Sequence, residues 1–333
     1  MEIKILNKKI GESNSTFIIA EGGINHNGKF KIAKKIIEKA ALCNVDAIKF
    51  QTFKAENLAS EKSKYFKLFR KLELQDEEFN ELGDIAKSQK IVFLSTPFSN
   101  NAVDLLEKNN IAAYKIASGD LTNIPLIKHV AQKRKPILLS TGMANLEEIK
   151  ESVKIIKKFH DKISILHSNS AYPSPENELN LNAIGTLAKK FKYPIGYSDN
   201  GNNPIVPIVA VSLGAKIIEK HFTIDKKMSG PDHALSSDPS EMKEIVKNIR
   251  MVENALGDGV KKCQKSELEN RIHARRSITI IKDCEKGEKI ELLKLDIKRP
   301  GTGIEPKFLE KIIGKKAKKN LKIDETLDWK DVY

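Results

Sequence analysis

Short apolar runs rich in β-branched residues alternate with longer stretches of helical periodicity along most of the chain. In the longer stretches, apolar residues recur every three or four positions, as in KIAKKIIEKAAL, NAVDLLEKN, LEEIKESVKIIKKF and EMKEIVKNIRMVENAL. The short runs predict strands at 17–23, 47–52, 91–97, 112–118, 136–142, 163–169, 194–199 and 217–223.

Eight strand–helix repeats in about 250 residues are the number and length typical of a (β/α)8 TIM barrel. A doubly wound open sheet is the alternative, but its GxGxxG fingerprint does not follow the first strand. The alternation ends near GDGVKKCQKSELEN, and short strand-like pieces between Gly, Pro and charged turns follow it. We therefore predict an α/β barrel domain at 1–256, a linker at 257–274 and a small β-rich domain at 275–333.

The composition is that of a globular protein, with 40% hydrophobic and 31% charged residues. The sequence contains no run of about 18 apolar residues, and MEIKILNKKIGES lacks the apolar core of a signal peptide. We therefore expect a cytoplasmic protein without a membrane partner. Three cysteines without CxxC spacing argue against a disulfide framework or a cysteine zinc site.

The formal net charge is +14, which can indicate nucleic acid, an anionic membrane or a small anionic substrate. The lysines are scattered along nearly every predicted helix, and aromatic residues make up only 6% of the chain. Because a basic arm and stacking platforms are both missing, we do not expect nucleic acid as a partner. A solvated lysine-rich surface explains the charge, and attraction of an anionic substrate is the alternative.

Polar side chains close every predicted strand, and in a TIM barrel these carboxyl ends form the rim of the active site. In chain order they are Glu21; Lys49 and Gln51; Ser95 and Thr96; Lys115 and Ser118; Ser140 and Thr141; His167 and Asn169; Ser198 and Asp199; and Glu219 and His221. A single Ser or Thr at a strand end is usually a turn former or a helix cap. Polar groups at all eight ends indicate a binding site.

Two of these residues, Lys49 and Lys115, need anionic partners, because an unpaired ammonium inside a barrel mouth is costly. Lysines and hydroxyls together favour a compact polyanion such as a phosphorylated carboxylate. If they hold such an anion, they are buried unpaired charges in the protein alone, so removal of either lysine should leave the folded state intact or more stable.

Glu219 and His221 are two positions apart on one strand, so their side chains point the same way. With Asn200 or Asp199 from the neighbouring strand, His221 would form a sparse site for a divalent metal. A hydrogen-bonded rim histidine is the other interpretation, and the spacing leaves both open. The histidines of GGINHNGKF and SGPDH are interpreted as parts of loop structure.

An ordered set of motifs resembles the sialic acid synthases, which condense phosphoenolpyruvate with an N-acylated amino sugar. The motifs are IIAEGGINHNG, KFQTFKAENL, LSTPF, YKIASGD, LSTGM, GYSD, EKHFTIDKKMSGPDH and KRPGTGI. The resemblance spans roughly residues 15–330, and the C-terminal piece is similar to the family's antifreeze-like, β-clip SAF domain. Single motifs such as LSTGM are weak signals, whereas the ordered set is specific.

The resemblance assigns roles to residues of this chain. It implies that phosphoenolpyruvate is held by Lys49, Thr96, Lys115, Ser118, Ser140, Ser170 and Ser198. It implies that the acylamino sugar is contacted by Gln51, Tyr172 and Asp232, with Asn27 as a further substrate-binding residue. Glu219 and His221 match the acid and the metal ligand beside the reacting aldehyde, so that Lys49, Lys115, Glu219 and His221 form the catalytic set.

The resemblance also implies a cofactor and a partner. The cofactor is a divalent metal, Mn²⁺ or Mg²⁺, that polarises the aldehyde. Arg299 of KRPGTGI matches an arginine that the SAF domain of one subunit places over the sugar in the other subunit. The expected assembly is a domain-swapped homodimer.

Four departures from the family pattern concern the site. SDN replaces SDH, so Asn200 stands where the second histidine ligand is usual, and an amide oxygen remains a suitable ligand for hard ions. HSNSAYP replaces HCxxxYP, Asp120 replaces a glutamate, and the segment from Phe53 to Gln75 is shorter than in many relatives. These changes affect the choice of sugar more than the reaction.

Three functions are weighed. The first is a nonulosonic acid synthase that makes N-acetylneuraminate or a relative such as legionaminate. The second is a related phosphoenolpyruvate-dependent ulosonate phosphate synthase, in which KRPGTGI would have no role. The third is a non-catalytic carbohydrate-binding protein that has lost its metal, against which the retention of Lys49, Lys115, Glu219 and His221 argues.

Overall fold

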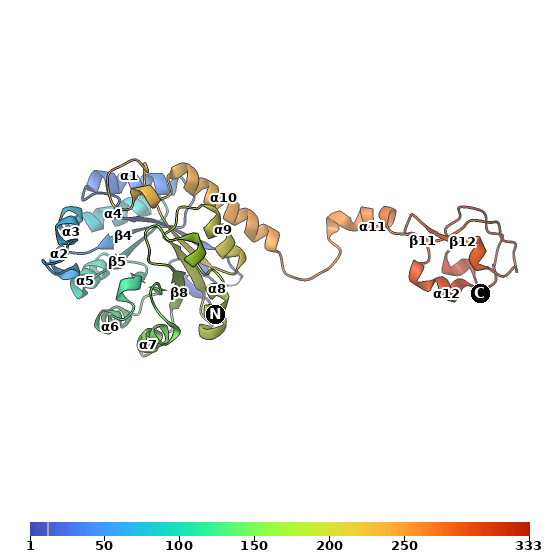
Figure 1. The fold of residues 1–333 in the computed structure, drawn as a ribbon, viewed down its shortest axis with the longest axis horizontal. Coiled ribbons are helices and arrows are strands. Elements are labelled where there is room, and N and C mark those ends of the chain that lie inside the picture. The colour runs from blue at the N-terminus through green and yellow to red at the C-terminus, as the bar shows by residue number, and fades with distance from the viewer. Residues whose placement is uncertain (12) are drawn as a thin grey trace. The chain divides into compact units, whose positions relative to one another are not determined.

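The computed structural model describes residues 1–11 and 13–333. The contacts within the chain divide it into two compact units, Met1–Gly257 and Asp258–Tyr333 (Figure 1). Helix α11 (Leu268–Ala274) lies in the segment expected to be a linker.

Eight parallel strands close the first unit into a barrel, in the order β10-β3-β4-β5-β6-β7-β8-β9. Their bounds are β3 (Phe17–Gly23), β4 (Ala47–Thr52), β5 (Val92–Pro97), β6 (Tyr114–Ile116), β7 (Ile137–Ser140), β8 (Ile163–Ser168), β9 (Ile195–Asp199) and β10 (Ile217–His221). The TIM-barrel prediction is therefore confirmed, with each strand inside a predicted run.

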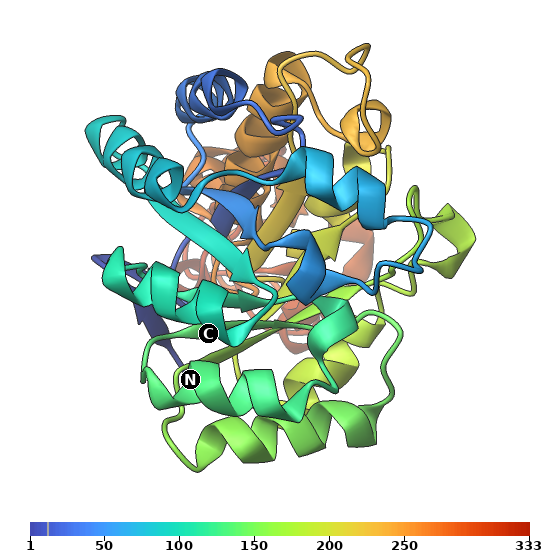
Figure 2. The same cartoon turned by 90° about the vertical axis from the view of Figure 1, so that its left-hand side faces the viewer.

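Helices surround the barrel, as Figures 1 and 2 show from two directions. Their bounds are α1 (Phe30–Ala41), α2 (Ala55–Leu58), α3 (Phe66–Leu72), α4 (Asp76–Ser88), α5 (Asn100–Lys108), α6 (Ile124–Gln132), α7 (Leu146–Lys157), α8 (Ala183–Phe191), α9 (Ile205–Ser212) and α10 (Pro239–Leu256). Most bury one apolar stripe against the strands; in α1 the buried positions are Ala33, Ile36, Ile37 and Ala40, the spacing of one helix face.

A hairpin of β1 (Ile3–Ile5) and β2 (Lys8–Ile10) precedes the barrel and was not predicted. Its buried Ile3, Ile5 and Ile10 share one apolar cluster with barrel-lining residues such as Phe17 and Leu94. The hairpin thus closes the amino-terminal end of the barrel, and the opposite end remains for the site.

The segment between β4 and α4 folds into α2 and α3 over a small apolar cluster that includes Ile24, Phe53 and Leu72. Gly28 allows this packing, because its φ is +67° and a Cβ on it would lie 2.2 Å from the carbonyl oxygen of Lys71. The end of α3 is therefore pressed against the INHNG loop at the rim of the barrel.

The second unit has its own apolar core. The buried residues are Ile278, Ile280, Cys284, Ile290, Leu295, Ile304, Ile312, Ala317, Leu321, Leu327 and Val332. A two-stranded antiparallel sheet of β11 (Ser277–Ile280) and β12 (Leu295–Lys298) and the short helix α12 (Leu309–Ile312) form around it. Isolated bridges such as Cys284–Leu321 supply the remaining backbone pairing.

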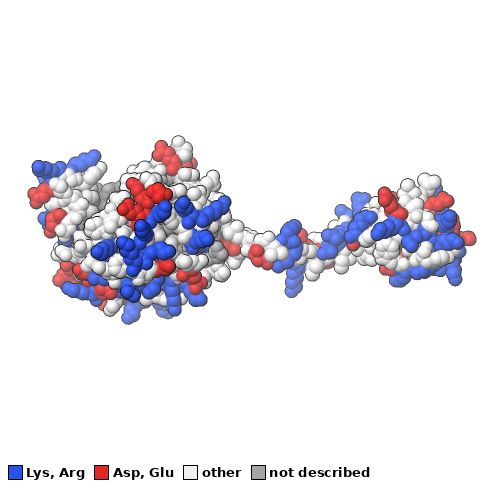
Figure 3. All heavy atoms as spheres, turned by 90° about the horizontal axis from the view of Figure 1, so that it is seen from below, with Lys and Arg blue, Asp and Glu red and all other residues white. Residues whose placement is uncertain are grey.

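Lys and Arg are interspersed with Asp and Glu over the visible face of the first unit (Figure 3). This distribution agrees with a solvated surface and shows no continuous basic band on that face. Within 1–11 and 13–333, none of the helices combines the length and the apolar character needed to cross a bilayer.

Candidate active site

A polar cavity of about 280 Å³ opens where the carboxyl ends of the barrel strands meet. Every strand contributes to its wall, as expected for the rim of a TIM barrel. The predicted site residues that line it are Lys49, Gln51, Thr96, Lys115, Ser118, Ser140, Ser170, Tyr172, Ser198, Asn200, Glu219 and His221. Asn27, Asp232 and Arg299 are the predicted residues outside this lining.

Lys49 is buried in the cavity wall on β4 and has protein partners. Its Nζ lies 2.6 Å from Oε2 of Glu21 and 3.7 Å from Oε2 of Glu219, and it donates to Oγ1 of Thr96 at 3.0 Å. Burial opposes the charge, but the attraction of Glu21 and Glu219 outweighs it and raises the pKa of Lys49. Lys49 is therefore a charged group that the protein itself neutralises.

Lys115 on β6 has weaker partners than Lys49. Its Nζ lies 3.5 Å from Oε1 of Glu219 and donates to the carbonyl oxygen of Ile116 at 3.4 Å. Burial lowers the pKa of Lys115, and Glu219 opposes this only in part. An added anion would therefore stabilise Lys115 more than Lys49.

The two acids of this cluster differ in protonation. Burial raises the pKa of Glu21 to about 7, although Lys49 acts against this shift. Burial also opposes the ionised form of Glu219, but Lys115 and Lys49 together lower its pKa to about 2. Oε1 of Glu219 additionally accepts a hydrogen bond from Oγ of Ser198 at 2.8 Å. The expectation that both lysines lack anionic partners in the protein is wrong, because Glu21 and Glu219 supply them.

The unequal pairing predicts unequal effects on stability. Lys49→Met should lower the free energy of unfolding by about 3–5 kcal/mol, because it leaves Glu21 buried without its close cation. Lys115→Met should lower it less, since Glu219 keeps Lys49 and Ser198. Urea denaturation measures both, with Lys133→Met as the control because Lys133 pairs with half-exposed Asp104 on the surface. Equal losses in both cavity variants would contradict this account.

Hydroxyl groups converge on one side of the cavity. Ser118 begins the 3-10 turn η1 (Ser118–Asp120), and its Oγ accepts a hydrogen bond from the backbone N–H of Gly142 at 3.0 Å. A Cβ on Gly142 would lie 2.2 Å from Oγ of Ser170 and 2.8 Å from Oγ of Ser118. The glycine therefore lets two hydroxyls approach a backbone amide in the cavity whose wall also contains Lys115. Such donors suit a phosphate group.

On another side of the cavity, Tyr172, His221 and Asp232 lie together. The rings of Tyr172 and His221 meet edge to face with centroids 5.7 Å apart, and Tyr172 is exposed. Nδ1 of His221 lies 4.0 Å from Oδ2 of Asp232, whose pKa burial raises to about 6. An aromatic face beside a carboxylate and an imidazole suits a hydroxylated or acylated sugar.

His221 has the properties of a metal ligand. Burial lowers its pKa to about 3, so the imidazole is neutral at neutral pH, and its Nδ1 is buried without a hydrogen-bond partner. Both N–H groups of Asn200 are used, on the carbonyl oxygen of Asn169 at 2.7 Å and on Oγ of Ser168 at 3.3 Å. The amide oxygen of Asn200 is therefore the atom left for a ligand.

These two donors fit a hard divalent ion that keeps water and substrate oxygens as its other ligands. A cage of protein ligands is not present: the described part of the chain contains no group of three or more His, Cys, Asp or Glu arranged to hold a metal.

Three predicted residues are not part of the cavity lining. Nδ2 of Asn27 donates to the carbonyl oxygen of Ser229 at 2.8 Å, so Asn27 holds the loop that leads to Asp232. Asp232 itself lies beside the cavity, next to His221. Arg299 is exposed in the second unit, directly after β12.

Ser168 and Phe98 also line the cavity and were not predicted, whereas Glu21, which lines it too, was predicted as a rim residue but without a role. The role of Glu21 could have been found, because a buried lysine on the next strand requires an anion. On β8 the cavity-facing residue is Ser168, whereas Nε2 of His167 lies 2.7 Å from the carbonyl oxygen of Leu179. The rim position expected for His167 is therefore wrong by one residue.

Comparison with known proteins agrees with this geometry. The model of the NeuB family matches residues 36–261, and the model of the SAF domain matches residues 275–332.

Two relatives are named N,N'-diacetyllegionaminic acid synthase. The one from Campylobacter jejuni is 44% identical over 94% of this chain and 98% of its own length. The one from Legionella pneumophila is 40% identical over 98% of this chain and 97% of its own length. A crystal structure of N-acetylneuraminic acid (sialic acid) synthetase from Leptospira borgpetersenii superposes with a TM-score of 0.79 at 37% identity, covering 81% of this chain and 95% of that one.

Proposed function

This chain belongs to the NeuB family, and we propose that it is a nonulosonic acid synthase that joins phosphoenolpyruvate to an open-chain acylamino sugar. The resemblance to sialic acid synthases is thereby confirmed. The observation that carries the proposal is the pair of buried lysines beside converging hydroxyls, next to the group of Tyr172, His221 and Asp232. One part suits a phosphorylated carboxylate and the other suits a sugar.

We propose that phosphoenolpyruvate occupies the lysine side of the cavity. Lys115, with weaker protein partners than Lys49, faces one anionic group, and Ser118 and Ser170 donate to the phosphate beside the amide of Gly142. Lys49 stays paired with Glu21 and holds the second anionic group through its remaining proton. Binding both charges in a buried site stabilises them where the leaving phosphate departs.

The reaction balances with the groups at hand. C3 of phosphoenolpyruvate forms a bond to the aldehyde carbon, whose oxygen takes up a proton. Water adds at C2 and loses a proton, and the C2–O bond to phosphate then breaks. With its pKa near 7, Glu21 can accept or donate a proton at neutral pH. Glu219, ionised in the same cluster, stabilises the positive charge of the lysines during these steps.

We propose that a divalent ion binds at His221 and Asn200. Sialic acid synthases generally depend on a metal, and Mn²⁺ or Mg²⁺ suits one imidazole and one amide oxygen. Such an ion supplies Lewis acidity toward the sugar aldehyde when it is bound. The contribution of the chain is to present a neutral His221 and to direct the oxygen of Asn200 by binding its nitrogen.

Substitution of Asn200 tests this placement. Asn200→His should tighten the binding of Mn²⁺, because imidazole is a stronger ligand than an amide oxygen for first-row ions. Isothermal titration calorimetry measures the affinity without turnover. Asn101→His is the control, because Asn101 is exposed on α5 and the new histidine would lie outside the cavity lining. Unchanged affinity in Asn200→His would place Asn200 away from the metal.

For the sugar, we propose an acceptor that leads to a nonulosonic acid of the legionaminic type. The two relatives with that name cover nearly the whole chain at 44% and 40% identity. An acceptor that leads to N-acetylneuraminate is the second candidate, because the sialic acid synthetase structure is 37% identical.

Mass spectrometry tests the proposed function. The protein is incubated with phosphoenolpyruvate, Mn²⁺ and a panel of mono- and di-N-acetylated mannosamine derivatives. We expect inorganic phosphate and a nine-carbon 2-keto acid with a di-N-acetylated sugar. Phosphate release with aldose phosphates alone would support a ulosonate phosphate synthase, and no release with any sugar would support a binding protein.

We further propose that the active form is a homodimer in which Arg299 of one subunit completes the sugar site of its partner. The support is the SAF match at 275–332 and the exposure of Arg299 beside a turn that its own unit holds in place.

A further inference from the structure

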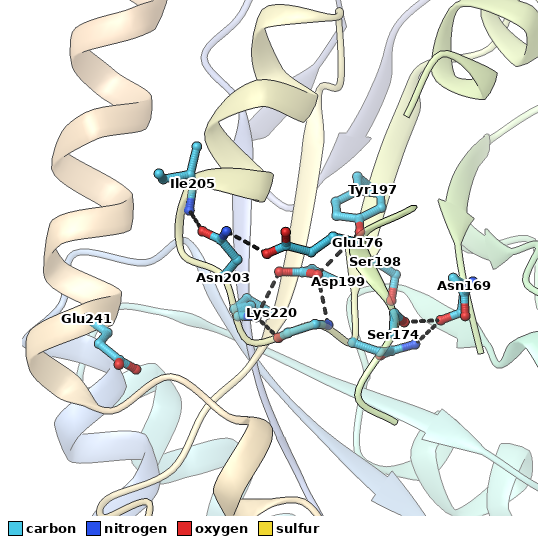
Figure 4. Close-up of polar contacts among 12 residues, drawn as sticks. Asn169, Ser174, Glu176, Tyr197, Ser198, Asp199, Asn203, Ile205, Lys220 and Glu241 are labelled. Carbon is cyan, nitrogen blue, oxygen red and sulfur yellow. Dashed lines mark hydrogen bonds and ion pairs between the residues drawn. The ribbon is translucent and has the colours of Figure 1, made fainter. Parts of the chain in front are cut away.

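A buried ion pair lies on the outer side of the barrel wall, behind the sugar half of the cavity. Lys220 stands between Glu219 and His221 on β10, so its side chain points away from the cavity that both neighbours line. Its Nζ lies 2.7 Å from Oδ2 of Asp199 on β9, and both side chains are excluded from solvent (Figure 4). None of the roles proposed above uses this pair.

The pair closes a turn around Asn200. Oδ1 of Asp199 accepts the backbone N–H of Gly201 at 3.0 Å and the hydroxyl of Tyr197 at 3.3 Å. Nζ of Lys220 also donates to the carbonyl oxygen of Gly201. The N–H and the carbonyl oxygen of Gly201 are therefore both held. The side chain of Asn200, the residue before it, points toward the cavity.

The same turn holds the loop that carries Tyr172. Asn200 donates to the carbonyl oxygen of Asn169, and its own carbonyl oxygen accepts the N–H of Ser174 at 3.1 Å. Oγ of Ser174 donates to the carbonyl oxygens of Asn169 and Ala171. Tyr172 lies between these anchored residues, so its position depends on the turn at Asn200.

A second link joins the same two loops. Nδ2 of Asn203 donates to Oε1 of Glu176 at 2.7 Å, and Oδ1 of Asn203 accepts the N–H of Ile205 at the start of α9. Figure 4 shows this link beside the Lys220–Asp199 pair. The ion pair and these hydrogen bonds therefore connect β10 through residues 199–203 to the loop 169–176. That loop carries Tyr172, which lines the sugar side of the cavity.

Stability alone does not require charges at this place. Apolar residues occupy other outward-facing wall positions, such as Ile218 and Ile116, and a buried ion pair is often no more stabilising than a packed apolar pair. An apolar side chain at 220 could fill the space, but it could not bond the carbonyl oxygen of Gly201. The directional bonds are what the charges add.

We propose that Lys220 and Asp199 are positioning residues for the acceptor sugar, acting through Asn200 and the loop of Tyr172. This inference rests on the proposed function, since it assigns the pair to the sugar half of that site. The phosphoenolpyruvate half takes most of its contacts from other strands, through Lys49 on β4, Lys115 on β6 and Ser118 after β6. Ser170, which follows β8, is its one contact in the loop of Tyr172. Loss of the pair should therefore weaken sugar binding selectively.

The test compares the affinities for the two substrates in the full-length protein. Calorimetry gives the Kd for phosphoenolpyruvate, and saturation-transfer NMR with the panel of N-acetylated mannosamine derivatives gives the Kd for the sugar without turnover. Lys220→Met should raise the sugar Kd at least about tenfold and the phosphoenolpyruvate Kd by less than about threefold, because Ser170 is the one phosphate contact in the affected loop. Lys220→Arg should restore part of the sugar affinity, because a guanidinium can still bond both Asp199 and Gly201.

A paired variant separates positioning from stability. Lys220→Met with Asp199→Asn leaves no unpaired buried charge, so it should fold even if Lys220→Met does not. It keeps an acceptor for the N–H of Gly201 but loses the bond to the carbonyl oxygen. We expect near-normal thermal stability with the raised sugar Kd.

Asp46→Asn is the control. Asp46 stands directly before β4, at the far end of the barrel, where it pairs with Arg250 and accepts the N–H of Ile18 on β3. It should lower stability without changing either Kd. A normal sugar Kd in the folded paired variant would overturn the inference, and so would an equal loss of both substrates. Failure of the wild type to release phosphate would instead refute the proposed function, while the Kd values would still decide the role of the pair.

Discussion

His221→Ala is expected to abolish turnover in a protein that still folds and still binds phosphoenolpyruvate. His221 is the one histidine among the described residues that line the cavity, and its neutral imidazole provides the nitrogen proposed to bind the metal. Folding should survive, because Nδ1 makes no hydrogen bond that the substitution would remove. Phosphoenolpyruvate binding should survive because Lys115 and Lys49 are unchanged.

The measurement combines phosphate release at saturating Mn²⁺ with calorimetry of phosphoenolpyruvate and of Mn²⁺. We expect a rate at the background level, a phosphoenolpyruvate Kd within a few-fold of wild type, and lost Mn²⁺ binding. His129→Ala is the matched control, because His129 lies on α6 at the surface and pairs with Asp104. A near-normal rate in His221→Ala with Mn²⁺ would show that the metal assignment is wrong.

The barrel could be predicted from the sequence because its signals are local. Runs such as FIIAEGG and AIKFQT are buried on both faces, so they begin as apolar runs and carry polar residues only toward their ends at the site. Helices such as α1 carry one apolar stripe. Because active sites of TIM barrels lie at the carboxyl ends of the strands, Lys49, Lys115, Glu219 and His221 could be assigned to one rim without any knowledge of tertiary contacts.

Features that depend on partners distant in sequence could not be predicted in this way. The hairpin β1–β2 is too short to signal a barrel closure, and its role appears only in the contacts of Ile5 and Ile10 with the barrel interior. The charge balance of Lys49 depends on Glu21, 28 residues earlier, and on Glu219, from the last strand. The prediction of which β8 residue faces the cavity was wrong, because ISILHS is buried on both faces. Hydrophobicity therefore does not distinguish His167 from Ser168.

The turn that carries Arg299 is held rigidly within its own unit. The N–H of Gly301 donates to the carbonyl oxygen of Ile272 at the end of α11 at 2.7 Å, and Oγ of Ser277 donates to the carbonyl oxygen of Pro300 at 2.8 Å. A Cβ on Gly301 would lie 2.6 Å from Cβ of Arg275, so α11 packs directly on the turn. The segment expected to be a linker therefore supports Arg299, which a rigid turn presents to solvent.

Mixing of two inactive variants should restore activity if Arg299 acts across a dimer. Arg299→Ala and His221→Ala homodimers should each have at most a few per cent of wild-type activity, because each lacks one group in both of its sites. In a heterodimer, one site combines His221 of one subunit with Arg299 of the other, so it is intact. The second site carries both substitutions.

After subunit exchange of equal amounts, half of the dimers are heterodimers with one intact site each. Activity should therefore rise to about a quarter of the wild-type value, a gain that neither parent can give. Native mass spectrometry with one subunit carrying an affinity tag verifies the heterodimers. Lys307→Ala is the control: it removes a surface pair with Glu305 in the same unit, and its homodimer should remain active alone. Verified heterodimers without regained activity would show that Arg299 serves the site of its own chain or none, and a chain that stays monomeric while active would exclude the shared site altogether.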